Sequence, residues 1–207
     1  MLKTFCNPNT LEVGIDEAGR GPLFGRVYIG ACILHPEDNN PLIKDSKKLT
    51  KRKLLMSYDY IKENAIDYTT VWMDEKTIDD INIFQATMNG MHKAIDNLIV
   101  KPEFILVDGD KFNTYFNKNN NKMINHLCVI GGDDTYTCIA GASILAKVER
   151  DRYIEELCKN NSELNLDEKY GLLSNKGYGT KKHINGIQTY GITKWHRKSF
   201  GICRKFS

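Results

Sequence analysis

Acidic residues stand at three places where a buried strand is expected to end. The carboxylates share this placement and are Asp16, Glu17, Asp108, Asp133 and Asp134. Functional sites in open α/β sheets assemble beyond strand ends, so these side chains are candidates for one shared site. Clustered carboxylates repel one another unless cations lie between them, and hard oxygen ligands favour Mg²⁺ or Mn²⁺. Two such ions can position a water for in-line attack on a phosphodiester and stabilise the leaving oxygen.

Each cluster taken alone also has an ordinary structural explanation. Asp108-Gly109 and Gly132-Asp133-Asp134 are typical turn sequences. The conjunction at three strand ends, in a chain with a basic C-terminal end, favours the metal site over three unrelated turns.

Charge is distributed unevenly. Residues 169–207 hold nine Lys and Arg and no Asp or Glu, whereas residues 1–168 hold 20 basic and 26 acidic side chains. An acidic body with a basic end suits a protein that gathers metal ions in one place and phosphates in another, although a solvated basic tail would give the same charges. We therefore expect a core at 1–168 and a basic segment at 169–207 that completes substrate binding within the same domain.

The elements that must position these residues alternate along the chain. Strands are expected at Val13 to Asp16, Val27 to Leu34, Tyr68 to Met73, Phe104 to Asp108 and Leu127 to Ile130. Helices are expected at Thr50 to Asn64, Thr77 to Leu98, Thr135 to Lys159 and Thr180 to Tyr190, with Thr50 and Thr77 as N-caps. This order predicts an α/β layer fold with a mixed sheet. Trp72 is expected in the core, and residues 117–122 in a surface loop.

Composition excludes several classes of protein. The 207 residues, 41% of them hydrophobic, support one sizeable core, and no apolar run is long enough to span a membrane. The N-terminus lacks the features of a signal peptide, so we expect a soluble, cytoplasmic protein. Six dispersed cysteines without a C-x-x-C pair indicate reduced thiols, not a structural zinc site.

Six segments resemble the ribonuclease HII family, in that family's order. They are Gly14-Ile15-Asp16-Glu17-Ala18-Gly19-Arg20-Gly21-Pro22, Asp45-Ser46-Lys47-Lys48-Leu49, Val107-Asp108-Gly109, Ala142-Ser143-Ile144-Leu145-Ala146-Lys147-Val148, Lys176-Gly177-Tyr178-Gly179-Thr180 and His196-Arg197-Lys198-Ser199-Phe200. The resemblance spans nearly the whole chain, and its first motif is highly specific. It implies a ribonuclease H-like fold, with helices flanking a mixed sheet and a small helical C-terminal extension.

The resemblance also implies an activity and a catalytic site. Two metal ions, Mg²⁺ or Mn²⁺, would be held by Asp16, Glu17, Asp108 and a fourth carboxylate, which we assign to Asp133 although Asp134 is adjacent. The enzyme would hydrolyse the RNA strand of RNA/DNA hybrids and cut 5′ to single ribonucleotides in duplex DNA, leaving 3′-hydroxyl and 5′-phosphate ends. We expect a monomer that contacts no membrane.

Substrate contacts follow from the same resemblance. The Gly19-Arg20-Gly21 element would bring its backbone close to the ribose 2′-hydroxyl, which distinguishes RNA from DNA. Tyr178 would stack on the neighbouring sugar, although a Tyr between glycines is more often a loop anchor. Phosphate contacts, which position a duplex without reading bases, are expected from basic side chains. These are Lys47, Lys48, Lys181, Lys182, Arg197 and Lys198.

Two alternatives remain at this stage. The related ribonuclease HIII family has a similar core and carries an additional N-terminal domain, whereas only 15 residues precede Asp16 here, so we expect ribonuclease HII. A non-catalytic hybrid-binding module would need only phosphate contacts and no divalent ion. The clustered carboxylates argue against that module, because negative charge beside a phosphate backbone weakens binding.

Overall fold

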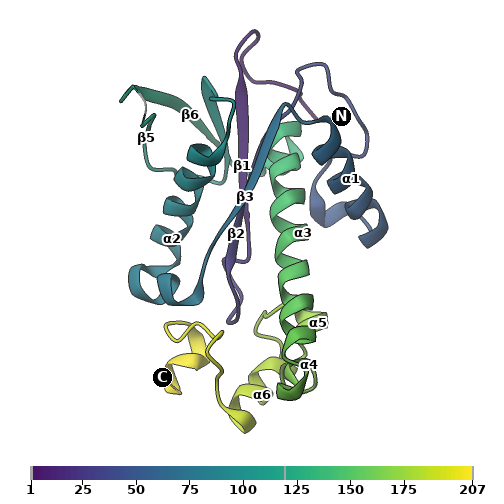
Figure 1. Ribbon diagram of the computed structural model, residues 1–207, viewed down its shortest axis with the longest axis vertical. Coiled ribbons are helices and arrows are strands. Elements are labelled where there is room, and N and C mark those ends of the chain that lie inside the picture. Colours follow the sequence, from purple (N-terminus) through teal and green to yellow (C-terminus); the bar gives the residue numbers. More distant parts are fainter. Residues whose placement is uncertain (1, 119, 207) are drawn as a thin grey trace.

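A six-stranded mixed sheet forms the centre of the computed structural model, which describes residues 2–118 and 120–206 (Figure 1). The strand order is β3-β2-β1-β4-β6-β5. The strands are β1 (Glu12–Ala18), β2 (Val27–Ile33), β3 (Asp67–Met73), β4 (Phe104–Asp108), β5 (Tyr115–Phe116) and β6 (Met123–Val129). β1 is antiparallel to β2 and parallel to β4, and β4 is parallel to β6. β1, β4 and β6 therefore run in the same direction. Their carboxyl-terminal ends, where the three acidic clusters are found, lie at the same end of the sheet.

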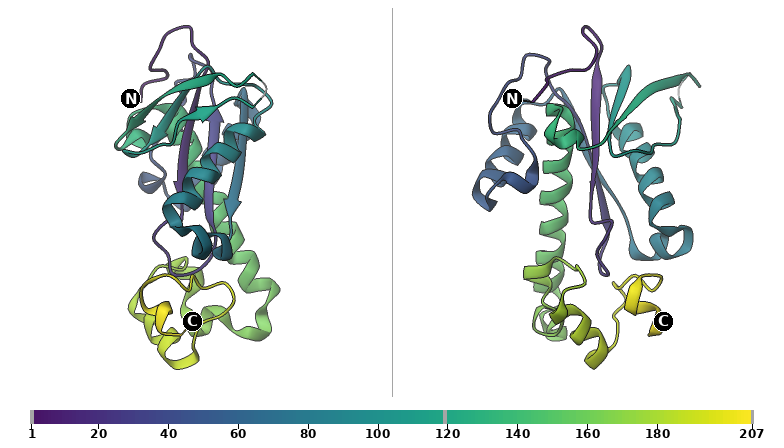
Figure 2. Two further views of the ribbon diagram at one scale, coloured as in Figure 1. Left: turned by 90° about the vertical axis from the view of Figure 1, so that its left-hand side faces the viewer. Right: turned by 180° about the vertical axis from the view of Figure 1, so that it is seen from behind.

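Helices cover both faces of the sheet. The α-helices are α1 (Lys51–Asn64), α2 (Glu75–Asn97), α3 (Thr137–Asn160), α4 (Leu166–Tyr170), α5 (Leu172–Asn175) and α6 (Lys181–Tyr190). Short 3-10 turns are η1 (Ser46–Lys48), η2 (Gly132–Asp134), η3 (Ser162–Leu164) and η4 (Gly201–Lys205). α2 packs on one face, and α3 with α1 beside it packs on the other (Figures 1 and 2). The mixed α/β architecture predicted from the sequence is confirmed.

Close contact between α3 and the sheet depends on two glycines in the strands. A Cβ at Gly14 would lie 2.1 Å from the backbone carbon of Cys138, and one at Gly30 would lie 2.2 Å from the Ala142 carbonyl oxygen. Any larger residue at position 14 or 30 would push the helix away from the sheet. The small-residue face of α3 thereby brings Ser143 close to β1, where Asp16 lies.

Local capping explains where the helices begin. Thr50 and Thr180 cap α1 and α6 through their side chains, as the sequence predicts for Thr50. The prediction for Thr77 is wrong, because Asp74 is the N-cap of α2 and its carboxylate accepts from the Thr77 amide. α2 is also interrupted at Asn82, whose φ is 66° and whose side chain accepts from the Gln85 amide.

The polar stretch at 117–122 joins two paired strands. β5 and β6 are antiparallel, and Asn117 donates its amide to the Lys122 carbonyl across the turn; position 119 lies outside the described residues. β6 begins at Met123, four residues before the expected strand. Trp72 is also misplaced by the sequence argument, since it is 41% exposed on edge strand β3 and stacks on the Arg26 guanidinium, 3.7 Å away.

The C-terminal segment packs around the far end of α3. This helix extends beyond the sheet, and α4, α5 and α6 gather at its end, with η4 below the lower end of α2 (Figure 1). A separate apolar cluster forms there. It contains Phe24, Ile154, Leu157, Leu166, Tyr170, Leu172, Ile187 and Cys203. Among the helices of residues 2–118 and 120–206, none is both long and apolar enough to cross a membrane.

Candidate active site

Strand pairing brings Asp16 and Asp108 next to each other. The preceding residues, Ile15 and Val107, are partners in the parallel β1–β4 ladder. Asp16 is 5% exposed, and one carboxylate oxygen accepts from the Glu17 amide at 2.6 Å. Asp108 accepts from the amide of Gly132 at 2.7 Å. The carboxyl groups are therefore fixed by backbone contacts at adjacent strand ends.

Burial and mutual repulsion disfavour the charged forms of these carboxyls. Burial, then the negative charges of Glu17 and Asp108, raises the pKa of Asp16 well above its usual value, although a hydrogen bond from Ser143 opposes this shift. Burial also raises the pKa of Glu17, against the opposing effect of Arg20, and the pKa of Asp108. Acidic groups that repel one another in a cleft are typical of functional sites.

The two candidates for the fourth carboxylate lie in different surroundings. Asp133 is 4% exposed, and its side chain accepts from the Lys47 ammonium at 3.0 Å. The Asp134 side chain is 56% exposed and pairs at 2.6 Å with Lys48. Asp133 is also close enough to Asp108 for its negative charge to contribute to the raised pKa of Asp108, after burial. Neither residue lines the cavity described below, but Asp133 is the buried member of the pair and the one next to Asp108.

The donor chemistry fits a hard divalent cation. Asp16, Glu17 and Asp108 supply carboxylate oxygens, and a cation among them would relieve the repulsion that raises their pKa values. Across residues 2–118 and 120–206, no three acidic, His or Cys side chains are already arranged to hold a metal. Arg20 pairs with Glu17 at 3.2 Å and Lys47 with Asp133. These basic groups offset part of the negative charge of Glu17 and Asp133.

A cavity of about 460 Å³ joins the acidic groups to the predicted substrate contacts. Its lining comprises Asp16, Glu17, Ala18, Gly19, Arg20, Gly21, Ser46, Lys47, Asp108, Ser143, Lys147, Arg150 and Tyr178. Tyr178 is 49% exposed, and a Cβ at Gly21 would lie 3.4 Å from its ring. Gly19 has a φ of +94°, and a Cβ there would meet the Arg150 side chain at 2.0 Å. Only glycine fits at position 19.

Arg197 does not occupy the place that the sequence argument gives it. We predicted a phosphate contact, but the side chain is fully buried. Its guanidinium donates to the carbonyl oxygens of Gly19, Arg20, Pro22 and Gly25 at 2.6 to 2.9 Å. The prediction is therefore wrong for the contact, because Arg197 holds the loop that contains the Gly-Arg-Gly element. Burial lowers the pKa of Arg197 to about 9.

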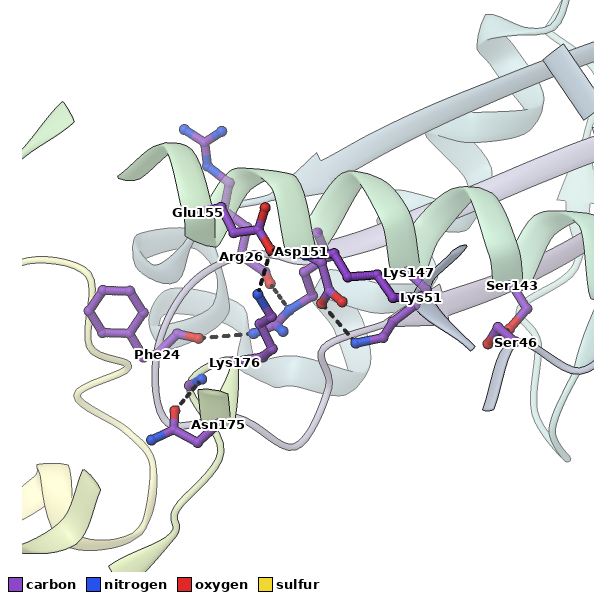
Figure 3. Close-up of polar contacts among 12 residues, drawn as sticks. Phe24, Arg26, Ser46, Lys51, Ser143, Lys147, Asp151, Glu155, Asn175 and Lys176 are labelled. Atoms are coloured by element: carbon purple, nitrogen blue, oxygen red, sulfur yellow. Dashed lines mark hydrogen bonds and ion pairs between the residues drawn. The ribbon is translucent and has the colours of Figure 1, made fainter. Parts of the chain in front are cut away.

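A second buried arginine supports the other end of the same loop. Arg150, on α3, donates to the carbonyls of Phe24 and Arg26, each at 3.2 Å, and both of these residues lie beside α3 in Figure 3. Sequence reasoning missed Arg150. Its signal was a basic residue within a helix whose neighbours Ile144, Leu145 and Val148 are apolar, where a solvated arginine is unexpected.

The remaining basic predictions divide between the cavity and the outer surface. Lys47 lines the cavity, whereas Lys181 lies with Lys169 and Lys182 along a separate concavity beside α6. Lys147 lines the cavity and pairs with Asp151 at 2.7 Å (Figure 3). Figure 3 also shows Ser46 beside Ser143, whose hydroxyl oxygens are 3.0 Å apart. This contact joins the η1 turn that carries Lys47 to α3.

Known proteins share this chain's sequence and architecture. Ribonuclease HII of Cytophaga hutchinsonii is 41% identical over 96% of this chain and 93% of the relative, and that of Bacteroides thetaiotaomicron is 40% identical over 98% and 95%. The crystal structure of ribonuclease H2 from Pyrococcus horikoshii OT3 matches with a TM-score of 0.75 and 26% identity, covering 94% of this chain and 96% of that one.

A more distant structure shows the fold alone. Bst-RNase HIII, solved in complex with Mn²⁺, has a TM-score of 0.65 and 18% identity and covers 95% of this chain but 68% of its own. The family model described as Ribonuclease HII matches residues 13–203, which include every strand but the first residue of β1. The chain therefore belongs to the ribonuclease HII family, whose members cleave RNA in RNA/DNA hybrids and depend on divalent metal ions.

Proposed function

We propose that this ribonuclease HII hydrolyses the RNA strand of hybrids and also cuts on the 5′ side of single ribonucleotides embedded in duplex DNA. The products would carry 3′-hydroxyl and 5′-phosphate ends. One observation carries the proposal: a single cavity is lined by three strand-end carboxylates, by the Gly19–Gly21 loop and by the exposed ring of Tyr178. The groups proposed for catalysis and those proposed to recognise a ribose therefore line the same cavity.

The carboxylates would hold two Mg²⁺ or Mn²⁺ ions. Asp16, Glu17, Asp108 and Asp133 are the proposed ligands, and Ser143 orients Asp16 by its hydrogen bond. When bound, such ions lower the pKa of a water and stabilise the charge on the leaving oxygen. Lys47 would exchange Asp133 for a substrate phosphate, since its side chain is 76% exposed.

Recognition of the ribose is supported by the orientation of the loop. Arg197 draws the carbonyls of Gly19 and Arg20 toward the protein interior. The described peptide bonds are all trans, and a trans peptide directs its C=O and N–H in opposite directions. The amides of Arg20 and Gly21 are therefore directed away from Arg197, as required of donors to a 2′-hydroxyl.

Tyr178 would recognise the junction with DNA by stacking. Its ring packs beside Gly21, so a sugar that contacts the loop backbone would also meet the ring. Stacking on an aromatic face does not depend on the base. The proposal therefore predicts selection for a ribose at one position, with little dependence on base sequence.

The test is a cleavage assay on a labelled DNA duplex that contains one ribonucleotide. With Mg²⁺ or Mn²⁺ we expect one cut, 5′ to the ribonucleotide, that is lost in Asp16→Asn and retained in the matched control Asp134→Asn. A full RNA/DNA hybrid serves as the second substrate. Cleavage of the hybrid alone would refute the single-ribonucleotide activity. Tight, salt-sensitive binding without cleavage of either substrate would refute catalysis and favour a hybrid-binding module.

A further inference from the structure

Two buried histidines connect Tyr178 to the C-terminal segment. His183 lies in the first turn of α6 and is 0% exposed, and His196 is 1% exposed. One ring nitrogen of His183, Nδ1, lies 2.9 Å from the Tyr178 carbonyl oxygen. The Nε2 atoms of the two histidines are 3.1 Å apart. The other nitrogen of His196, Nδ1, lies 2.9 Å from the Thr193 amide nitrogen.

The end partners fix the position of every proton in this chain of contacts. The Tyr178 carbonyl only accepts, so His183 must carry its proton on Nδ1 and its neutral ring presents a lone pair at Nε2. The Thr193 amide only donates, so His196 must have its lone pair at Nδ1 and its proton at Nε2. Both ends thus require one proton between the two Nε2 atoms. The hydrogen bonds run in one direction, from Thr193 through His196 and His183 to Tyr178.

The surroundings keep both rings neutral. Phe24 and Tyr170 contact the His196 ring edge to face, with centroids 4.9 and 5.0 Å away. Within the described residues, neither ring is hydrogen-bonded to a carboxylate, and the charged residues adjacent in sequence are both cationic, Lys182 before His183 and Arg197 after His196. Burial lowers the pKa of His183, and burial with the neighbouring His183 lowers that of His196 to about 3.

The backbone of Tyr178 is held more firmly than its ring. Its carbonyl accepts from both His183 and the Thr180 amide, and its own amide donates to the Asn175 carbonyl at 2.9 Å. Asn175 also accepts from the Gly177 amide, at the turn drawn in Figure 3. The ring is half exposed beside Gly21, so its position depends on this backbone.

We propose that His183 and His196 form a directional hydrogen-bond relay that positions Tyr178 over the ribose-binding loop. Neither histidine touches the cavity, so both are positioning residues. The effect of the relay on cleavage rests on the proposed role of Tyr178. The positions of the imidazole protons follow from the hydrogen-bond contacts alone. The relay would set how well the enzyme engages a single ribonucleotide, because misplacement of a binding group by about 1 Å can lower a rate by about a hundredfold.

The first test is nitrogen NMR of the imidazoles in the whole protein. We expect His183 as the Nδ1–H tautomer and His196 as the Nε2–H tautomer, both neutral at pH 6. The opposite tautomer at either residue, or a protonated ring at that pH, would overturn the relay whatever the enzyme cuts.

The second test is a double-mutant cycle on the single-ribonucleotide duplex. His183→Leu removes the donor to Tyr178, whereas His183→Asn can keep a donor near the position of Nδ1. We expect kcat/KM to fall about tenfold in His183→Leu, to recover in His183→Asn, and not to fall further when His183→Leu is added to Tyr178→Ala. His92→Leu is the matched control, since His92 also contacts a backbone carbonyl, that of Asn113, but does not line the cavity.

The outcomes separate the relay from the proposed function. If His183→Leu lowers kcat/KM by the same factor in the parent and in Tyr178→Ala, the histidines do not act by positioning Tyr178 and the proposal is overturned. If Tyr178→Ala itself leaves cleavage unchanged, the proposed role of Tyr178 fails, while the tautomers still decide whether the relay exists.

Discussion

The strand-end carboxylates and the buried arginines differ in how their charges are compensated by neighbouring groups. Asp16, Glu17 and Asp108 lie together and raise one another's pKa values or have them raised by burial. Arg150 and Arg197 are almost completely buried, but their guanidinium groups donate to backbone carbonyls of one loop. Burial of a charge is tolerated when its hydrogen bonds are made and is costly otherwise. The first region is therefore arranged to receive a ligand, and the second to hold the loop beside it.

Removing one carboxylate charge should have the largest effect on turnover. Asp108→Asn keeps an oxygen that can accept from Gly132 but lowers the negative charge, so we expect cleavage to fall about a thousandfold. The same change should leave the melting temperature unchanged or raised without divalent ions, because repulsion is relieved. Steady-state cleavage and thermal unfolding measure both. A variant that is inactive because it is destabilised would contradict the contrast between the two regions.

Removing a buried arginine should reverse this pattern. Arg197→Met leaves four loop carbonyls without their donor, and we expect the free energy of unfolding to fall by about 2–4 kcal/mol. Urea unfolding of this variant is compared with Lys181→Met, an exposed change expected within about 0.5 kcal/mol of the parent. Equal stability of the two variants would show that the Arg197 contacts contribute little.

Acid should change the stability contributed by the strand-end carboxyls and by the buried histidines near Arg197 in opposite directions. Below about pH 6.5 the unfolded histidines bind protons that His183 and His196 resist when folded, so this pair lowers stability as pH falls, by up to about 1.4 kcal/mol per pH unit for each ring. The carboxyls with raised pKa bind protons more readily when the protein is folded. Their protonation removes the mutual repulsion, so their contribution to stability rises as pH falls. Urea unfolding at pH 7, 6 and 5 should show a shallower decline in His196→Gln than in the parent. Parallel declines would contradict the histidine assignment.

The smallest effect is expected on the outer surface. If Lys181 contacts a phosphate, Lys181→Met should reduce the slope of log binding constant against log salt by about 0.9. Duplex binding at several salt concentrations measures this slope. Lys118→Met is the control, since Lys118 pairs with Asp96 away from the cavity. An unchanged slope would remove Lys181 from the interface.

Local patterns predicted most of the fold, and the errors have both local and tertiary causes. Thr50 caps its helix as predicted because the relevant amide lies three residues away. Asp74 displaced Thr77 because a carboxylate was available three residues earlier, and the β5 strand was hidden by its length of two residues. Hydrophobic periodicity and capping do not indicate whether a strand lies at the edge of the sheet, and the exposure of Trp72 depends on that position.

The parts of the candidate site that consist of short sequence motifs were predictable from the sequence. The acidic strand ends and the Gly19–Gly21 loop line one cavity in the structure. Arg197 was misplaced because basic C-terminal segments usually face solvent, whereas its partners are carbonyls more than 170 residues earlier in the chain. The contact between His183 and His196 likewise joins an α6 residue to the segment after that helix, which no spacing rule indicates.

The most direct measurement is calorimetric titration of the protein with Mn²⁺ near pH 6. We predict binding accompanied by proton release, because carboxyls with raised pKa must deprotonate to ligate the ion. Binding should be lost in Asp16→Asn and kept in Asp134→Asn. Undiminished binding in Asp16→Asn, or its loss in Asp134→Asn alone, would contradict the metal site at the strand ends.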